Sequence, residues 1–223
     1  SPGKVLLSNG RIVPSNGTIL FSGNYRTKPN TYVIRINGNK LLLSDFFKEQ
    51  VEGSGLFNGM FQGNLNTAKM IKQKGEVVRF SHIADGLSGK LSVEFKNGGI
   101  NSSLWMIDEL IPSFSSAATA ISKKIGLSYD TLISDFKIWK GKTTIDNFEL
   151  KGPQINLSAS ATANLVTGKL DGKIKATPAQ LLNSVTKSTP LLGGIFKNDL
   201  RDILAETHFT LDGTLEKPEL ILK

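Results

Sequence analysis

The chain has 223 residues, 39% of them hydrophobic, so it is long enough to bury a core as one large domain or two small ones. It has no cysteine, which excludes disulfide bonds, thiolate metal ligands and a cysteine nucleophile. The net charge of +8 is spread along the chain apart from a small cluster at Lys69, Lys72 and Lys74, which lacks interleaved aromatics, so we expect no nucleic-acid partner.

The first third of the chain predicts short strands between turn signals. Asn9-Gly10, Asn16-Gly17 and Gly38 are typical of turns, and Ser44-Asp45 predicts the N-cap of a short helix through Gln50. Glycines among the apolar residues after Leu56 indicate a bent or closely approached strand. Strands are expected at 4–7, 18–25, 32–37, 41–43 and 57–65.

The middle of the chain predicts helices. Residues 67–87 show a weak helical pattern, and a strand at 91–96 is expected to end at Asn97-Gly98. Residues 103–125 predict an amphipathic helix kinked at Pro112. Its apolar stripe comprises Leu104, Ile107, Ile111, Phe114, Ala118, Ile121 and Ile125. Because its polar side is serine-rich, we expect this helix to pack on the sheet, with a partner-binding or membrane-lying helix as the alternative.

The last third shows the cleanest alternation, with apolar side chains at every second position of 155–165. Further strands are expected around 136–138 and 148–150, and at 168–176, 207–215 and 219–222. Thr177-Pro178 predicts the start of a short helix through Thr186. One-sided strands are typical of an antiparallel sheet with one wet face. The fold class is therefore mainly β with a few helices: a curved antiparallel sheet that carries an amphipathic helix.

Motifs for catalysis are weak or missing. Gly53-Ser54-Gly55 lacks the spacing of a nucleophile elbow and of a dinucleotide-binding loop. His82 and His208 lie far apart in sequence, so we expect no metal site. We therefore predict that the protein is not an enzyme and needs no cofactor, and a hydrolase of unrecognised type is the least favoured reading.

The chain also lacks targeting signals. It has no apolar run of about 18 residues that would span a membrane, and no signal peptide. It opens with Ser1-Pro2-Gly3 and then enters a predicted strand, so we expect an internal fragment of a longer protein whose anchor lies elsewhere.

The order of these elements resembles the C-terminal region of bacterial AsmA-like proteins, with relatives such as TamB and YhdP. The resemblance rests on residues 88–100 followed by an amphipathic helix, on strands at 143–151 and 168–175, and on the closing Gly213-Thr214-Leu215 with Pro218. Residues 187–206 match poorly. On this basis we expect a single β-groove domain over 1–223, with N-terminal strands in 1–66, a helical segment with one strand in 67–130, and C-terminal strands in 131–223.

The resemblance implies an envelope protein held to the inner membrane and projecting into the periplasm. In such proteins a curled sheet forms a groove for phospholipid acyl chains, which implies transfer of lipid between the inner and outer membranes. The expected partners are a phospholipid or another acyl-chain lipid, the membrane surface through an anchor, and other envelope proteins. The predicted lining of the groove is Phe136, Ile138, Phe148, Leu150, Ile155, Leu157, Leu170 and Ile174.

The sequence leaves one alternative open. The same apolar surface is equally consistent with a filled core, in which case the chain would be a structural or assembly module that binds envelope proteins through a sheet edge. The residues alone do not separate an open groove from a closed core.

Overall fold

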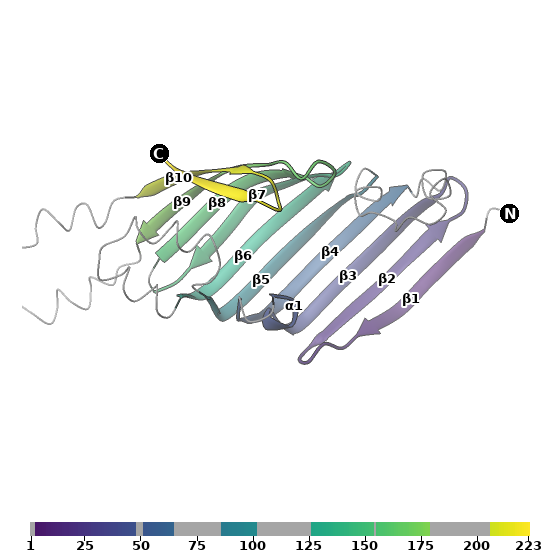
Figure 1. Ribbon diagram of the computed structural model, residues 1–223. Helices are drawn as coiled ribbons and strands as arrows, with labels where there is room; N and C mark the ends of the chain where they lie inside the picture. Colours follow the sequence, from purple (N-terminus) through teal and green to yellow (C-terminus); the bar gives the residue numbers. More distant parts are fainter. Residues whose placement is uncertain (1–2, 48–50, 65–85, 102–125, 154, 179–205) are drawn as a thin grey trace, which may run out of the picture.

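The computed structural model describes residues 3–47, 51–64, 86–101, 126–153, 155–178 and 206–223. These residues form one sheet of eleven strands, arranged in chain order and paired antiparallel throughout (Figure 1). The strands are β1 (Lys4–Ile12), β2 (Thr18–Arg26), β3 (Thr31–Leu42), β4 (Ser54–Asn64), β5 (Ser88–Ile100), β6 (Leu127–Trp139), β7 (Lys142–Lys151), β8 (Ile155–Asn164), β9 (Leu170–Pro178), β10 (Thr207–Gly213) and β11 (Pro218–Leu222). One short helix, α1 (Ser44–Phe47), follows β3.

The sheet is a meander, because each strand pairs with the next one along the chain. Figure 1 shows that the strands turn progressively from β1 to β10, so that the sheet is twisted and curled rather than flat. The prediction of a mainly β, antiparallel fold is confirmed.

The two faces of the sheet differ in chemistry, since residues directly opposite each other on neighbouring strands share a face. Phe57, Val93 and Ser134 face one another across β4, β5 and β6. This row continues through Phe148, Ala159, Ile174 and Phe209 on β7 to β10. We call this side the apolar face. The neighbouring row, Asn58, Ser92 and Asp135, lies on the opposite side, which we call the polar face.

The best-buried part of the molecule lies on β5 to β10. Leu150 and Ile155 are almost completely buried there, and aliphatic and aromatic side chains of the apolar face pack around them. The buried members of this cluster are Leu43, Phe95, Ile100, Leu127, Tyr129, Leu150, Ile155, Leu157, Ile174, Ala176 and Phe209. The apolar alternation of these strands therefore has its expected cause, the removal of one face from water.

Three predicted turns lie inside strands. The ladder of β1 shifts between Leu7 and Gly10, and that of β3 shifts after Gly38. In β5, Asn97 has a positive φ of 50°, and pairing resumes at Gly98. The predictions that strands end at these places are wrong, because a β-bulge or a single left-handed residue uses the same Asn and Gly residues as a turn and leaves the ladder intact on both sides.

Other boundaries also differ. The helix predicted from Thr177-Pro178 is wrong at these two residues, which pair with Asn156 and Ile155 as the end of β9. The sixth strand begins at Leu127, within the segment expected to hold a single strand. The helix predicted to follow Leu43 is confirmed over Ser44–Phe47. The amphipathic helix at 103–125, most of 67–87 and residues 179–186 of the last helix lie outside the described residues.

Candidate functional site

All eight residues predicted to line a groove lie on the apolar face of four adjacent strands, β6 to β9. Leu150 is directly opposite Leu157, and Phe148 is separated from Ile174 only by Ala159 of the strand between them. Ile155, Leu157, Leu170 and Ile174 are buried with Leu150. Phe136, Ile138 and Phe148 are half-buried. The structure thus brings the eight together on one surface.

The apolar face extends well beyond these four strands. The residue opposite Phe136 on β5 is Leu91, and the rows continue across β4 and β3 to β2. The additional side chains are Phe21, Ile34, Ile36, Phe57, Phe61, Leu91, Val93 and Phe95 on one flank, with Phe209 and Leu211 on the other. The sequence prediction missed them as site residues, although their alternation with polar residues carried the same signal.

The apolar face carries no charged side chain in the paired positions of the described strands. Lysines, arginines, aspartates and glutamates that lie next to it in sequence, such as Arg35 beside Ile36 and Lys90 beside Leu91, point to the polar face. A charge left unpaired on an apolar surface is costly, so both a packed core and a surface in contact with hydrocarbon need this separation.

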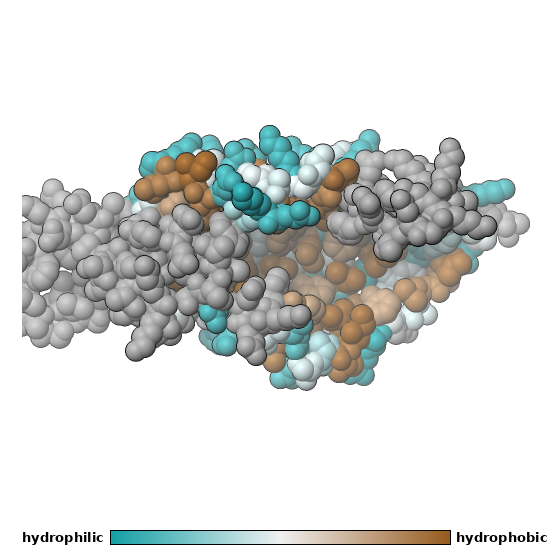
Figure 2. Space-filling view, viewed as in Figure 1, coloured by the Kyte–Doolittle hydropathy of each residue, from teal (hydrophilic) through white to brown (hydrophobic). Residues whose placement is uncertain are grey.

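Burial on the apolar face is concentrated on β7 to β10, and it is lower on β11 and on most of β1 to β4. Leu150, Leu157, Leu170 and Ile174 on β7 to β9 are buried. On β2 to β4, Tyr32 and Leu41 are also buried, but Phe21, Ile36, Phe57 and Phe61 are only half-buried. Ile34 is 37% exposed, and Val5 on β1 is 59% exposed. Figure 2 shows brown, apolar side chains gathered in the hollowed part of the molecule. Apolar surface is therefore accessible on the N-terminal half of the sheet.

Aromatic rings on this half lie over glycines of the neighbouring strand. A Cβ atom placed on Gly38 would lie 2.7 Å from Cε1 of Phe57, and one placed on Gly89 would lie 2.8 Å from Cδ1 of Phe61. In the described strands, the directly opposed pairs are Gly10 with Phe21, Gly38 with Phe57, Gly55 with Phe95, Gly63 with Tyr32, Gly89 with Phe61, and Gly98 with Tyr129. Each ring occupies the space that a side chain at the glycine position would fill, so the ring lies close to the backbone of the neighbouring strand.

Ion pairs lie on the polar face. Glu206 contacts both Lys175 and His208, with its carboxylate oxygens 2.6 Å from Nζ and 2.9 Å from Nε2. The hydrogen bond from Lys175, helped by the charges of Lys175 and His208, lowers the pKa of Glu206. On β6, the hydrogen bond to Asp146 raises the pKa of Lys137. These charged groups lie on the wet side, and the paired positions of the described strands place no charged side chain on the apolar face.

No three acidic or histidine side chains in the described segments are placed to hold a metal ion. Within the same segments, no helix has the length and apolar character needed to cross a membrane. Comparisons of the chain with models of known protein families, with curated proteins and with solved structures found no match. The chemistry of the sheet itself is therefore what bears on function.

Proposed function

We propose that this chain is a non-catalytic module that binds and transfers lipid, with acyl chains held in a groove formed by the apolar face of the curled sheet. The observation that carries the proposal is the separation of charge: the paired positions of the apolar face, from β1 to β11, hold only apolar side chains, glycine and a few hydroxyl groups. Such a surface suits hydrocarbon and offers nothing that orients a polar substrate.

The energetics favour an elongated apolar ligand. Each methylene that leaves water gains about 0.8 kcal/mol, so an acyl chain lying across several strands gains free energy along its whole length. Phe57, Phe61 and Leu91, which are only half-buried, offer this contact on the N-terminal half of the sheet. The rings of Phe57 and Phe61 lie against glycines of the neighbouring strands, so they present apolar surface close to the backbone of the sheet.

The cellular setting of the proposal rests on the resemblance to AsmA-like proteins. On that basis we propose that the module works in the periplasm, as part of a protein anchored to the inner membrane. Its role there would be to support phospholipid transport to the outer membrane and the upkeep of that membrane.

The experiment that tests the proposal compares two adjacent residues on opposite faces of β4. A photo-crosslinking amino acid at Phe61 would lie on the apolar face, and the same amino acid at Gln62 would lie on the polar face. We expect lipid adducts in cells at Phe61 and none at Gln62, together with phospholipid in an organic extract of the purified protein by mass spectrometry. Equal labelling at both positions, or an extract without lipid, would overturn the proposal.

A structural or assembly module remains the second candidate, and the edge of the sheet favours it. Within the part of the chain that the structure describes, the first strand pairs with β2 alone, and its Val5, Leu6 and Leu7 are 59%, 65% and 48% exposed. An exposed edge of this kind can accept an extended segment of another protein as an additional strand. Crosslinks from Leu6 to a protein partner, combined with a lipid-free extract, would favour this function over lipid transfer.

A further inference from the structure

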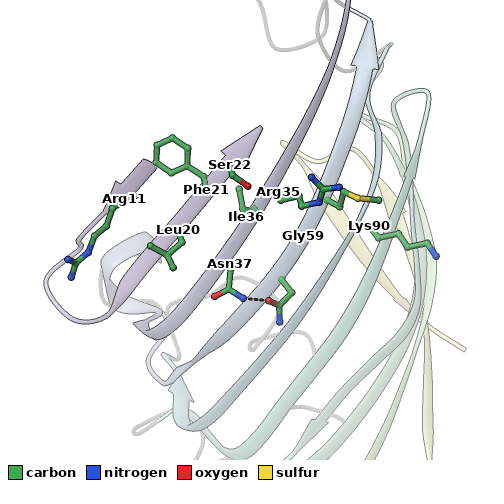
Figure 3. A pocket seen from close by; sticks show the side chains of 11 residues that line it. Arg11, Leu20, Phe21, Ser22, Arg35, Ile36, Asn37, Gly59 and Lys90 are labelled. Atoms are coloured by element: carbon green, nitrogen blue, oxygen red, sulfur yellow. Dashed lines mark hydrogen bonds between the residues drawn. The ribbon is translucent and has the colours of Figure 1, made fainter. Parts of the chain in front are cut away.

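The polar face is hollowed over β1 to β5. The hollow has a volume of about 750 Å³ (Figure 3). Phe21, Ile36 and Gly59 are among its lining residues although they belong to a row of the apolar face, so we infer that their backbone forms its floor. The side chains of Arg11, Leu20, Arg35, Met60 and Lys90 rise around this floor from five successive strands. The hollow lies on the opposite side of the sheet from the apolar face, so it is a separate surface.

The charge of this hollow is positive and uncompensated. Among the described residues, three cations line it, Arg11, Arg35 and Lys90, and no carboxylate does. None of the three forms an ion pair within the described segments, in contrast with Lys137 and Lys175, which pair with Asp146 and Glu206. Clustered cations without acidic partners attract anions, and guanidinium groups bind phosphate with two parallel hydrogen bonds.

The register of the strands places Arg35 in the middle of this arrangement. Arg35 on β3 is opposite Met60 on β4, which is opposite Lys90 on β5. Two strand spacings separate the backbones of Arg35 and Lys90, about 10 Å in total. Arg11 lies two strands away on the other side, and Figure 3 shows Arg11 and Lys90 at opposite ends of the hollow with Arg35 between them. An anion held by Arg35 therefore experiences positive charge from both ends.

The remaining lining is partly polar and partly apolar. The Nδ2 group of Asn37 donates a hydrogen bond to Oδ1 of Asn58, which fixes the two amides and leaves the Asn58 amide hydrogens for a ligand. Leu20 and Met60 are 49% and 46% exposed, although they lie on the polar face. A purely inorganic anion would leave these two side chains in water, whereas a ligand with a hydrocarbon portion would cover them.

We propose that this hollow binds a phosphate-bearing amphiphile, with the phosphate at Arg35 and the hydrocarbon against Leu20 and Met60. The proposal does not depend on lipid transfer along the apolar face, because the two surfaces are on opposite sides of the sheet. The phosphate group could come from a lipid headgroup or from free phosphate, and the ligands of the experiment separate these sources.

Isothermal titration calorimetry on the full chain tests the proposal with three probes: dihexanoyl phosphatidic acid below its micelle concentration, inorganic phosphate, and phosphatidylglycerol vesicles. We expect saturable binding of dihexanoyl phosphatidic acid, and binding of inorganic phosphate at least about tenfold weaker. Binding of vesicles without binding of the soluble lipid would overturn the proposal in favour of a membrane-docking face. If inorganic phosphate bound as tightly as dihexanoyl phosphatidic acid, Leu20 and Met60 would not contribute to binding, and the proposal of an amphiphilic ligand would be overturned.

Variants locate the site. Arg35→Gln removes the central charge, and we expect it to weaken the binding of dihexanoyl phosphatidic acid at least about tenfold, as the loss of a charge-assisted hydrogen bond does. The matched control is Lys173→Gln, which removes one positive charge from the polar face of β9, outside the hollow, and should leave affinity within about twofold. Lys90→Gln, at the end of the hollow on β5, removes a second charge of the hollow. Its affinity for dihexanoyl phosphatidic acid should also fall, and it serves as the test should Arg35→Gln perturb folding. Equal losses in Lys90→Gln and Lys173→Gln would overturn the location.

Discussion

The ring of Tyr129 on β6 lies directly over the backbone of Gly98 on β5. The two residues are opposite each other in the ladder, and a Cβ atom on Gly98 would overlap both the tyrosine ring and the backbone oxygen of Glu52. Tyr129 is only 2% exposed, and its hydroxyl donates a hydrogen bond to that same Glu52 oxygen at 2.6 Å. Burial and this hydrogen bond therefore hold the ring in place. A side chain at position 98 would overlap it, so steric overlap restricts this position to glycine.

This contact predicts a large difference between two neighbouring glycines. Gly98→Ala forces the Tyr129 ring or the backbone near Glu52 to shift, and we expect it to lower the free energy of unfolding by about 1–3 kcal/mol. Gly99→Ala is the control, because the nearest atom to a Cβ there is 3.7 Å away, an ordinary contact. Chemical denaturation of both variants measures the difference. Equal stability of the two would show that Tyr129 can move aside.

The same tyrosine predicts an unusual titration at alkaline pH. Burial raises the pKa of Tyr129 to about 12 and also raises the pKa of Tyr32. Because the folded-state pKa of Tyr129 lies above its value of 10.0 in the unfolded chain, its contribution to stability is complete below pH 10 and is lost as the pH rises toward 12. Absorbance of ionised tyrosine near 295 nm should show this late step, and Tyr129→Phe should remove the part of it that Tyr129 contributes, while Tyr32 still titrates late. A complete titration near pH 10 in the folded protein would contradict the burial.

Glu206 predicts the opposite behaviour at acid pH. Its folded pKa is lowered, chiefly by the hydrogen bond from Lys175, so its contribution to stability is present above the ordinary glutamate value of 4.5 and is lost as the pH falls through the lower folded value. Lys175→Gln should move the carboxyl pKa of Glu206 upward, which carbon-detected NMR measures. Lys173→Gln, two residues away on the same face of β9, is the control and should leave that pKa unchanged. An unchanged pKa in Lys175→Gln would mean that the pair does not form in solution.

The fold could be predicted from the sequence where one face of a strand is consistently buried. The alternation from Ile155 to Ala163 identified β8 and the face of each side chain, because burial on one side imposes a period of two. Asn97 shows where local reasoning fails: its Asn-Gly-Gly context is that of a turn, yet the ladder with β6 continues on both sides of it. Only the pairing with a distant strand, here Tyr129 opposite Gly98, decides between a turn and an irregular strand.

The candidate site was predictable in kind but not in extent. Leu150 and Leu157 were recognised as sharing a face, and the register places them directly opposite each other. Nothing in the sequence indicated that Arg35 and Lys90 line one hollow, because they belong to strands that are separated by another strand. Such relationships depend on which strand is the neighbour of which, and a short-range pattern contains no information about it.

The difference between the faces yields the last prediction. Leu150 on β7 and Leu56 on β4 are the same residue type in the same sheet, but Leu150 is fully buried on the apolar face and Leu56 is 38% exposed on the polar face. Leu150→Ala removes buried methyl groups and leaves a cavity among the packed side chains, so we expect a loss of about 2–5 kcal/mol.

Leu56→Ala, which removes the same atoms from a position in contact with water, should cost far less, within about 1 kcal/mol. Thermal and urea unfolding of both variants gives the comparison, with circular dichroism to confirm that the strands are retained. Similar losses at the two positions would mean that the polar face is also covered in solution, and the assignment of wet and dry sides would then be wrong. A large loss of stability in Leu150→Ala alone would establish that the C-terminal half of the apolar face is packed core. A mobile acyl chain would then have room to bind only on the more open N-terminal half, around Phe57 and Phe61.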